Sequence, residues 1–197
     1  MGACKPQVPI HQSHRALQDF AALQVAPGVT VTSSGSPYVW SGGTISGAGT
    51  VTFGGGLTVN YASSVSASAA LAIAGGVCSI AGTMTIAGSV TASVPCSVTA
   101  PLQGTGAWVQ TAGGTVLSAN VDGPVSVSGP GSVVSTAAGA TVTVGGVVTV
   151  GVDASFSVGK GGEWGAGAET LVGSRGRWAG GRMGGARSLD VVACGPQ

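Results

Sequence analysis

The chain has 197 residues, of which 37 are glycine and only 7% are charged, and its formal net charge is +1. A hydrophobic content of 44% with so little charge excludes an intrinsically disordered chain, and the small net charge excludes a strong electrostatic attraction to nucleic acid or to an acidic membrane. Gly, Ser and Thr interrupt every apolar run before the roughly 20 residues needed to cross a bilayer, so we expect no membrane span.

Residues 1–24 differ in composition from the rest of the chain, and we expect them to form an N-terminal arm or cap. Residues 13–23 have the apolar spacing of a short amphipathic helix. Both histidines, His11 and His14, lie in this segment, where a solvated position is a better interpretation than a catalytic one. The segment lacks the apolar core of about 7–15 residues that a secretory signal contains, so the sequence predicts no export signal here.

Residues 25–159 alternate Val, Ile, Leu and Ala with Thr, Ser and Gly, a period of two that is typical of β-strands. No Asp, Glu, Lys or Arg occurs between Asp19 and Asp122. The clearest strand candidates are residues 29–31, 50–53, 57–59, 71–73, 84–86, 125–127, 141–144, 147–150 and 156–158. Strands this short form a core only by stacking, so the pattern predicts an all-β fold, a single-stranded parallel β-helix (β-solenoid) with coils of about 18–22 residues. An antiparallel sandwich is the alternative.

Residues 160–197 lose the Thr/Val alternation and form a Gly/Arg-rich tail. Three interpretations remain open for this tail: a flexible or disordered segment, a degenerate terminal coil, or a stretch that is foreign to the repeat. Residues 174–187 contain four arginines around Trp178, a weak signal for RNA binding. A plain solvated tail is the better interpretation, and we expect no nucleic-acid partner.

Residues suited to catalysis or metal binding are scarce in the repeat region. Asp122 and Asp153 are the only carboxylates there, and both lie near turn signals, where Asp commonly caps its own backbone. The four cysteines form no CxxC pair, and the Gly-Gly steps carry no Asp at the spacing of a calcium-binding β-roll. We therefore expect no catalytic residues, no metal and no cofactor.

Cys78 and Cys96 are separated along the chain by about the expected length of one coil. Equivalent positions of neighbouring coils lie about 4.8 Å apart, and this spacing is within the range of Cα separations of disulfides. The sequence therefore suggests a disulfide between Cys78 and Cys96. The alternative is two buried thiols that act as small apolar core residues.

The motif Thr-x-Thr recurs at residues 30/32, 50/52, 83/85 and 141/143. Strand alternation places both threonines of a pair on the outward side, and flat arrays of outward threonine on a β-solenoid resemble the surface of some ice-binding proteins. The intervals between the pairs are irregular, and the β-propensity of threonine explains the motif without any ligand.

Residues 40–59 read WSGGTISGAGTVTFGGGLTV, in the order W-x-G-G-T-(I/L)-x-G-x-G-T-(V/L)-T followed by a glycine turn and L-T-V. This unit resembles one that recurs in the passenger regions of autotransporters and in filamentous-haemagglutinin-like adhesins. The resemblance implies a right-handed parallel β-helix at a cell surface or outside a cell, which serves as a scaffold for adhesion and carries no catalytic residues.

From these observations we expect a structural or adhesive β-solenoid module of a surface or extracellular repeat protein, without catalysis. Its partners would be glycans or cell-surface proteins, and its open ends would favour self-association. Three alternatives remain: a β-helix lyase or glycosidase acting on carbohydrate, a Thr-x-Thr ice-binding protein, and a truncated fragment without a selected function.

Overall fold

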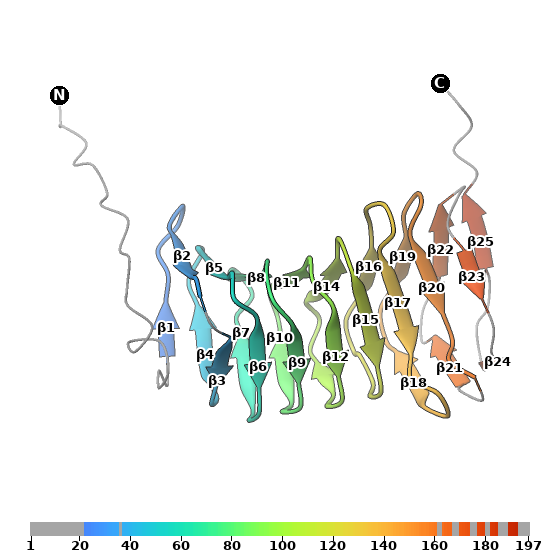
Figure 1. Ribbon diagram of the computed structural model, residues 1–197, viewed down its shortest axis with the longest axis horizontal. Coiled ribbons are helices and arrows are strands. Elements are labelled where there is room, and N and C mark those ends of the chain that lie inside the picture. The colour runs from blue at the N-terminus through green and yellow to red at the C-terminus, as the bar shows by residue number, and fades with distance from the viewer. Residues whose placement is uncertain are drawn as a thin grey trace, which may run out of the picture.

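The computed structural model describes residues 22–35, 37–160, 163–166, 170–173, 177–179, 182–184 and 189–192, with side chains for the first two ranges and for Glu163. All regular elements in these residues are β-strands, and they wind into a β-solenoid (Figure 1). The strand pairings are parallel, as in Thr30↔Thr50 and Cys78↔Cys96. The predicted β-solenoid is therefore confirmed, and the antiparallel sandwich is wrong.

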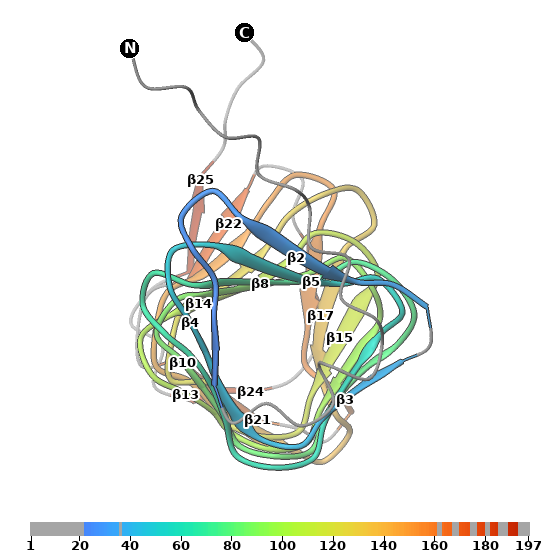
Figure 2. The ribbon, with the colours of Figure 1, turned by 90° about the vertical axis from the view of Figure 1, so that its left-hand side faces the viewer.

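Three faces surround a common core, as Figure 2 shows along the axis of the solenoid. Face A consists of β1 (Ala22–Gln24), β4 (Gly43–Ser46), β7 (Ser63–Val65), β10 (Met84–Ile86), β13 (Leu102–Gln103), β18 (Thr141–Val144), β21 (Glu163–Ala166) and β24 (Arg182–Gly184). Face A consists of two sheets, β1 to β13 and β18 to β24, and single β-bridges from Leu102 to Val121 and from Val121 to Val144 join them.

Face B is one continuous sheet in the order β2 (Thr30–Ser33), β5 (Thr50–Phe53), β8 (Ala70–Ile73), β11 (Ser89–Ala92), β14 (Ala107–Gln110), β16 (Val125–Val127), β19 (Val148–Val150), β22 (Thr170–Gly173) and β25 (Leu189–Val192). Face C contains β3 (Tyr38–Trp40), β6 (Leu57–Val59), β9 (Cys78–Ile80), β12 (Cys96–Val98), β15 (Gly114–Leu117), β17 (Val133–Thr136), β20 (Ser155–Ser157) and β23 (Arg177–Ala179). One strand from each face makes one coil, except that the bridge residue Val121 takes the place of the face A strand in the sixth coil, and we number the coils from β1–β2–β3.

The coil length varies around the expected value of about 18–22 residues. The coil that runs from Trp108 to its partner Val125 is slightly shorter than this range, and the coil that runs from Val125 to its partner Val148 is slightly longer. The additional residues of the longer coil lie in the turns, because the strands must stay in register to keep their backbone hydrogen bonds.

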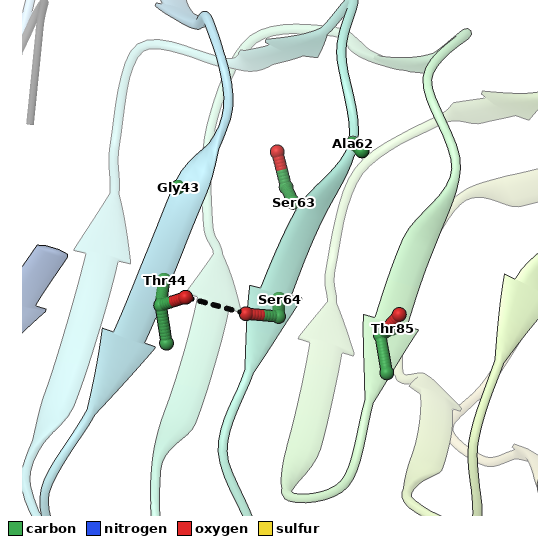
Figure 3. Close-up of a pocket in the computed structure, with 6 residues that line it drawn as sticks. All are labelled: Gly43, Thr44, Ala62, Ser63, Ser64 and Thr85. Carbon is green, nitrogen blue, oxygen red and sulfur yellow. Dashed lines mark hydrogen bonds between the residues drawn. The ribbon is translucent and has the colours of Figure 1, made fainter. Parts of the chain in front are cut away.

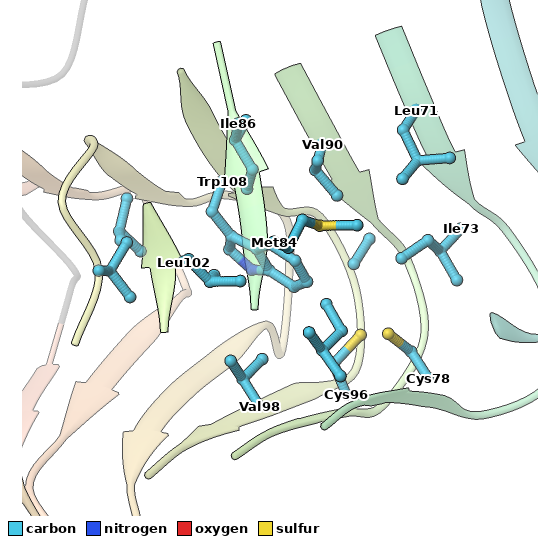
Figure 4. Packing of buried hydrophobic residues seen from close by; sticks show 14 of the residues in the cluster. Leu71, Ile73, Cys78, Met84, Ile86, Val90, Cys96, Val98, Leu102 and Trp108 are labelled. Carbon is cyan, nitrogen blue, oxygen red and sulfur yellow. The ribbon is translucent and has the colours of Figure 1, made fainter. Parts of the chain in front are cut away.

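The core is a single column of inward-facing apolar side chains that runs from Val25 to Val158. It follows from the period of two, since alternate residues of each strand point to the same side. The bulkiest fully buried side chains include Trp40, Trp108, Phe53 and Phe156. Figure 4 shows the part of the column around Met84 and Trp108. A single coil is too small to form a core of its own, so the stacked coils bury their apolar side chains together in this shared column.

Glycine is abundant because neighbouring coils approach closely at the corners. A Cβ atom added to Gly75, in the turn between β8 and β9, would lie 1.8 Å from the carbonyl oxygen of Gly54 in the preceding coil. Any larger residue would have to push the two backbones apart. Part of the glycine content is therefore a requirement of the stacking itself.

The described strands extend beyond the expected repeat region, residues 25–159, at both ends, and at the C-terminal end they agree with the degenerate terminal coil, one of the three interpretations left open for the tail. β1 starts at Ala22, so Ala22 and Leu23 lie in a strand and not in the helix expected for residues 13–23, of which the remainder lies outside the described residues. Beyond residue 160, β21 to β25 pair in parallel with the preceding coils and continue all three faces. The described strands of the Gly/Arg-rich tail thus extend the solenoid.

Candidate functional site

Face A presents a row of polar side chains at the centre of successive strands. Thr44, Ser64, Thr85 and Gln103 are register partners in β4, β7, β10 and β13. Their neighbours within the strands, such as Ile45 and Met84, point into the core, so these four residues point outward. The result is a ladder of uncharged hydrogen-bonding groups along the solenoid axis.

A shallow hollow of about 240 Å³ lies on this ladder. Its lining consists of Gly43, Thr44, Ala62, Ser63, Ser64 and Thr85 (Figure 3). The hydroxyl groups of Thr44 and Ser64 are 2.7 Å apart and hydrogen-bonded across the two coils. The small side chains leave room above the sheet, and the hydroxyl groups line that room with donors and acceptors.

Tyr61 lies directly before Ala62, at the corner that leads into face A, and its side chain is 63% exposed. By register its neighbours in the adjacent coils are Ser41 and Gly82, so no large side chain flanks it. A Cβ atom on Gly82 would lie 2.4 Å from the backbone nitrogen and oxygen of Tyr61, so any residue other than glycine would clash there. The other aromatic side chains that the structure describes, such as Trp40, are buried.

The sequence analysis did not identify this group of residues. Tyr61 is the one aromatic residue in the polar stretch of residues 60–64, and this is the only local signal. The hydroxyl groups of Thr44, Ser64 and Thr85 come together because of the coil register, which composition does not reveal.

The two candidate carboxylates lie at different corners. Asp122 follows the face A position of the sixth coil, and its Oδ2 accepts a hydrogen bond of 3.4 Å from the backbone N–H of Gly104 in the fifth coil. Asp153 lies between β19 and β20 at the corner of faces B and C, with a φ of 59°. Asp122 thus links two coils, and the two carboxylates lie at different corners of the solenoid.

Cys78 and Cys96 are direct register partners in β9 and β12, as their spacing predicted. Both are buried and both are free thiols in the structure, so the suggested disulfide stays a prediction. The hydrogen bond with Cys96, together with burial, raises the pKa of the Cys78 thiol. At neutral pH this thiol is therefore protonated and a poor nucleophile.

The four Thr-x-Thr pairs do not form one array. Those at residues 30/32 and 50/52 stack in register on face B, where Ala70 and Ala72 continue the two rows in the third coil. Those at residues 83/85 and 141/143 belong to face A. The regular threonine surface that an ice-binding function would use is thus limited to two coils.

The remaining candidates lie beyond the described side chains: His11 and His14 lie in residues 1–21, and Trp178 and the arginines around it lie in residues 174–187. Within the described ranges, no group of three or more His, Cys, Asp or Glu residues could hold a metal ion. None of the elements described in those ranges is a helix long and apolar enough to span a membrane.

Comparison with known proteins gives no relative: no family model, no curated protein and no solved structure matches this chain.

Proposed function

We propose that the protein is an adhesive β-solenoid module that binds neutral glycans at the face A hollow beside Tyr61. The observation that carries this proposal is the combination of hydroxyl groups in the hollow with an exposed tyrosine directly before Ala62, one of the residues that line it. A sugar ring has hydroxyl groups that can hydrogen-bond with Thr44, Ser64 and Thr85, and an apolar face that can stack on an aromatic ring.

The absence of charge in this part of the chain favours a neutral ligand. No Asp, Glu, Lys or Arg occurs between residues 20 and 121, so the hollow has no local partner for a carboxylate, sulfate or phosphate. The hollow is also smaller than the roughly 300–1,000 Å³ of typical small-molecule pockets, which suits one sugar unit of a longer chain. Such a contact is weak by itself, and adhesion would depend on many copies acting together.

Binding without catalysis is the second part of the proposal. Glycosidases and lyases of the two-carboxylate type need both groups within about 10 Å across the scissile bond. Asp122 and Asp153 lie at different corners of different coils, which argues against their use as such a pair. The solenoid then serves as a rigid support that holds the hollow in place.

A surface or extracellular location is the third part. It is supported by the resemblance of residues 40–59 to the repeat units of autotransporter passengers and filamentous-haemagglutinin-like adhesins. The solenoid fold agrees with this resemblance, since Trp40 is fully buried and residues 43–59 form one complete coil.

The test is an array of neutral and acidic oligosaccharides probed with the labelled full chain, followed by titration of the best ligand. We expect retention on neutral glycans only. Tyr61→Ala should weaken binding about three- to tenfold, because aromatic stacking contributes about 0.5–1.5 kcal/mol. Tyr61→Phe should keep most of the affinity, and Thr85→Val should lose about fivefold through one hydrogen bond of about 1 kcal/mol.

Val77→Ala is the matched control, because Val77 is 65% exposed and lies outside the hollow. This variant should bind like the wild-type protein. Circular dichroism of each variant checks that the solenoid remains folded. Retention of no neutral glycan, or equal affinity of Tyr61→Ala and the wild-type protein, would contradict the proposal.

A further inference from the structure

Cys78 and Cys96 hold a position that is suited to a covalent link between the third and fourth coils. They are direct partners in adjacent parallel strands, which places their Cα atoms about 4.8 Å apart and inside the range of disulfides. Both side chains point into the core, and Figure 4 shows their sulfur atoms directed toward one another. The backbone N–H of Cys78 donates a 3.0 Å hydrogen bond to the carbonyl oxygen of Pro95, which holds the two strands together at this point.

The same position makes the thiols inaccessible once the solenoid has formed. The exposed fraction of Cys78 is 0% and that of Cys96 is 4%. Thiol–disulfide exchange requires a thiolate that reaches the oxidant. Burial and the hydrogen bond between the two thiols raise the pKa of Cys78 and so disfavour its thiolate. Exchange in the folded state therefore needs a local opening of stacked coils in the middle of the rod.

We propose that Cys78 and Cys96 form a disulfide only while the chain folds, and that folding then preserves whichever redox state the pair has reached. A chain that folds with a small-molecule disulfide present would carry the bond. A chain that folds among reduced thiols would keep two free cysteines and would be oxidised afterwards only slowly, through local opening of the coils. This inference is independent of the proposed glycan binding.

The chemistry requires an external oxidant, and a small symmetrical disulfide such as oxidised glutathione supplies it. The thiolate of one cysteine attacks this disulfide, so that a mixed disulfide forms and one small thiol leaves. The second cysteine thiolate attacks the cysteine sulfur of the mixed disulfide, and the second small thiol leaves. Two electrons pass from the cysteines to the oxidant, and the two protons end on the two released small thiols.

The experiment uses the full chain with Cys4→Ser and Cys194→Ser, which leaves Cys78 and Cys96 as the only cysteines of the four. One sample is unfolded in denaturant with reductant, then refolded with oxidised glutathione. A second sample is first refolded in reductant, then moved to the same oxidant. Free thiols are counted with an alkylating reagent after denaturation, and intact mass distinguishes the internal bond from a glutathione adduct.

We expect both thiols of the first sample to be oxidised to the internal disulfide, which lowers the intact mass by that of two hydrogens. In the second sample the internal disulfide should form at least about tenfold more slowly. The bond in the first sample should also resist a mild reductant until denaturant is added, and its melting temperature should be several degrees higher. Cys96→Ser in the same background is the control, and it should form only the adduct. Circular dichroism confirms that every sample has refolded.

Two results would overturn the inference. If the first sample keeps two free thiols or forms only adducts, the pair does not form a bond. If the second sample forms the internal bond as fast as the first, the folded solenoid does not shield the pair.

Discussion

The third and fourth coils, residues 63–98, and the sixth and seventh coils, residues 121–157, have the same three-faced cross-section but different corners. We call them the compact coils and the wide coils. At the corner from face B to face C, residues 93–95 connect β11 to β12 in the compact coils, whereas residues 128–132 connect β16 to β17 in the wide coils. In that longer turn the hydroxyl group of Ser132 donates a 2.6 Å hydrogen bond to the carbonyl oxygen of Ser128.

This difference shows which structural features all coils share and which features vary from one coil to another. Strand register and the inward side chains are common to both regions, because backbone hydrogen bonds and core packing connect each coil to the next. The turns absorb changes in length, and the charged residues Asp122 and Asp153 lie in or beside turns of the wide coils. The compact coils contribute Ser63, Ser64 and Thr85 to the hollow, and they contain the cysteine pair.

The largest effect should come from the core, and it should be similar in both regions. Ile80 and Phe156 are both on face C and both 0% exposed. Ile80→Ala should lower the free energy of unfolding by about 2–5 kcal/mol, and Phe156→Ala by about 3–5 kcal/mol, because each leaves a cavity in the column. Urea denaturation followed by circular dichroism measures both values. A loss below about 1 kcal/mol for Phe156→Ala would show that the wide coils are not packed like the compact ones.

A smaller effect should distinguish the corners. Gly75→Ala in the compact coils places a Cβ atom 1.8 Å from the carbonyl oxygen of Gly54, so we expect a loss of about 3 kcal/mol, at the upper end of overpacking. Gly139→Ala in the wide coils meets no atom within 4 Å, and only its φ of +70° opposes the change, at about 1 kcal/mol. Thermal and urea unfolding of the two variants test the difference. Equal losses would contradict the distinction between tight and open corners.

The smallest effect concerns alkaline pH and the compact coils alone. The folded state raises the pKa of Cys78 above its unfolded value, so the stabilisation is complete below about pH 8.5 and is lost as the pH rises further. The reduced protein should lose up to about 1.4 kcal/mol per pH unit above that value. Cys78→Ala should remove this slope, which urea titrations between about pH 7 and 9.5 would measure. An unchanged slope in that variant would show that another group is responsible.

Part of the fold was predictable from local pattern. The expected strands at residues 50–53, 57–59, 84–86, 125–127 and 141–144 have the observed bounds, because Val, Ile, Leu or Phe alternate there with Thr or Ser. The strands Gly43–Ser46, Ser63–Val65 and Gly114–Leu117 were not among those expected. Their residues include Gly and Ser, whose intrinsic β-propensity is weak, and they are strands because the coils on either side supply partners.

The candidate site was less predictable than the fold. The alignment of Cys78 with Cys96 followed from their spacing and the expected coil length. The hollow did not, because Thr44, Ser64 and Thr85 belong to three successive coils and meet only if each intervening turn has the right length. Turn length also decides why the Thr-x-Thr pairs lie on two different faces.

The sequence alone determined the apolar column and the uncharged outer surface, because alternation within a strand decides which side chains point inward. It favoured parallel stacking but left the antiparallel sandwich open, and the strand pairings of the tertiary structure decided between the two. The tertiary structure decided which outward residues of different coils become neighbours. That outcome depends on the length of every turn between these residues, and the alternation of apolar and polar residues within the strands does not predict turn length. Tyr38 and Tyr61 show the difference: Tyr38 is buried and stacked on Phe53 with ring centroids 4.7 Å apart, whereas Tyr61 is exposed at the corner that leads into face A.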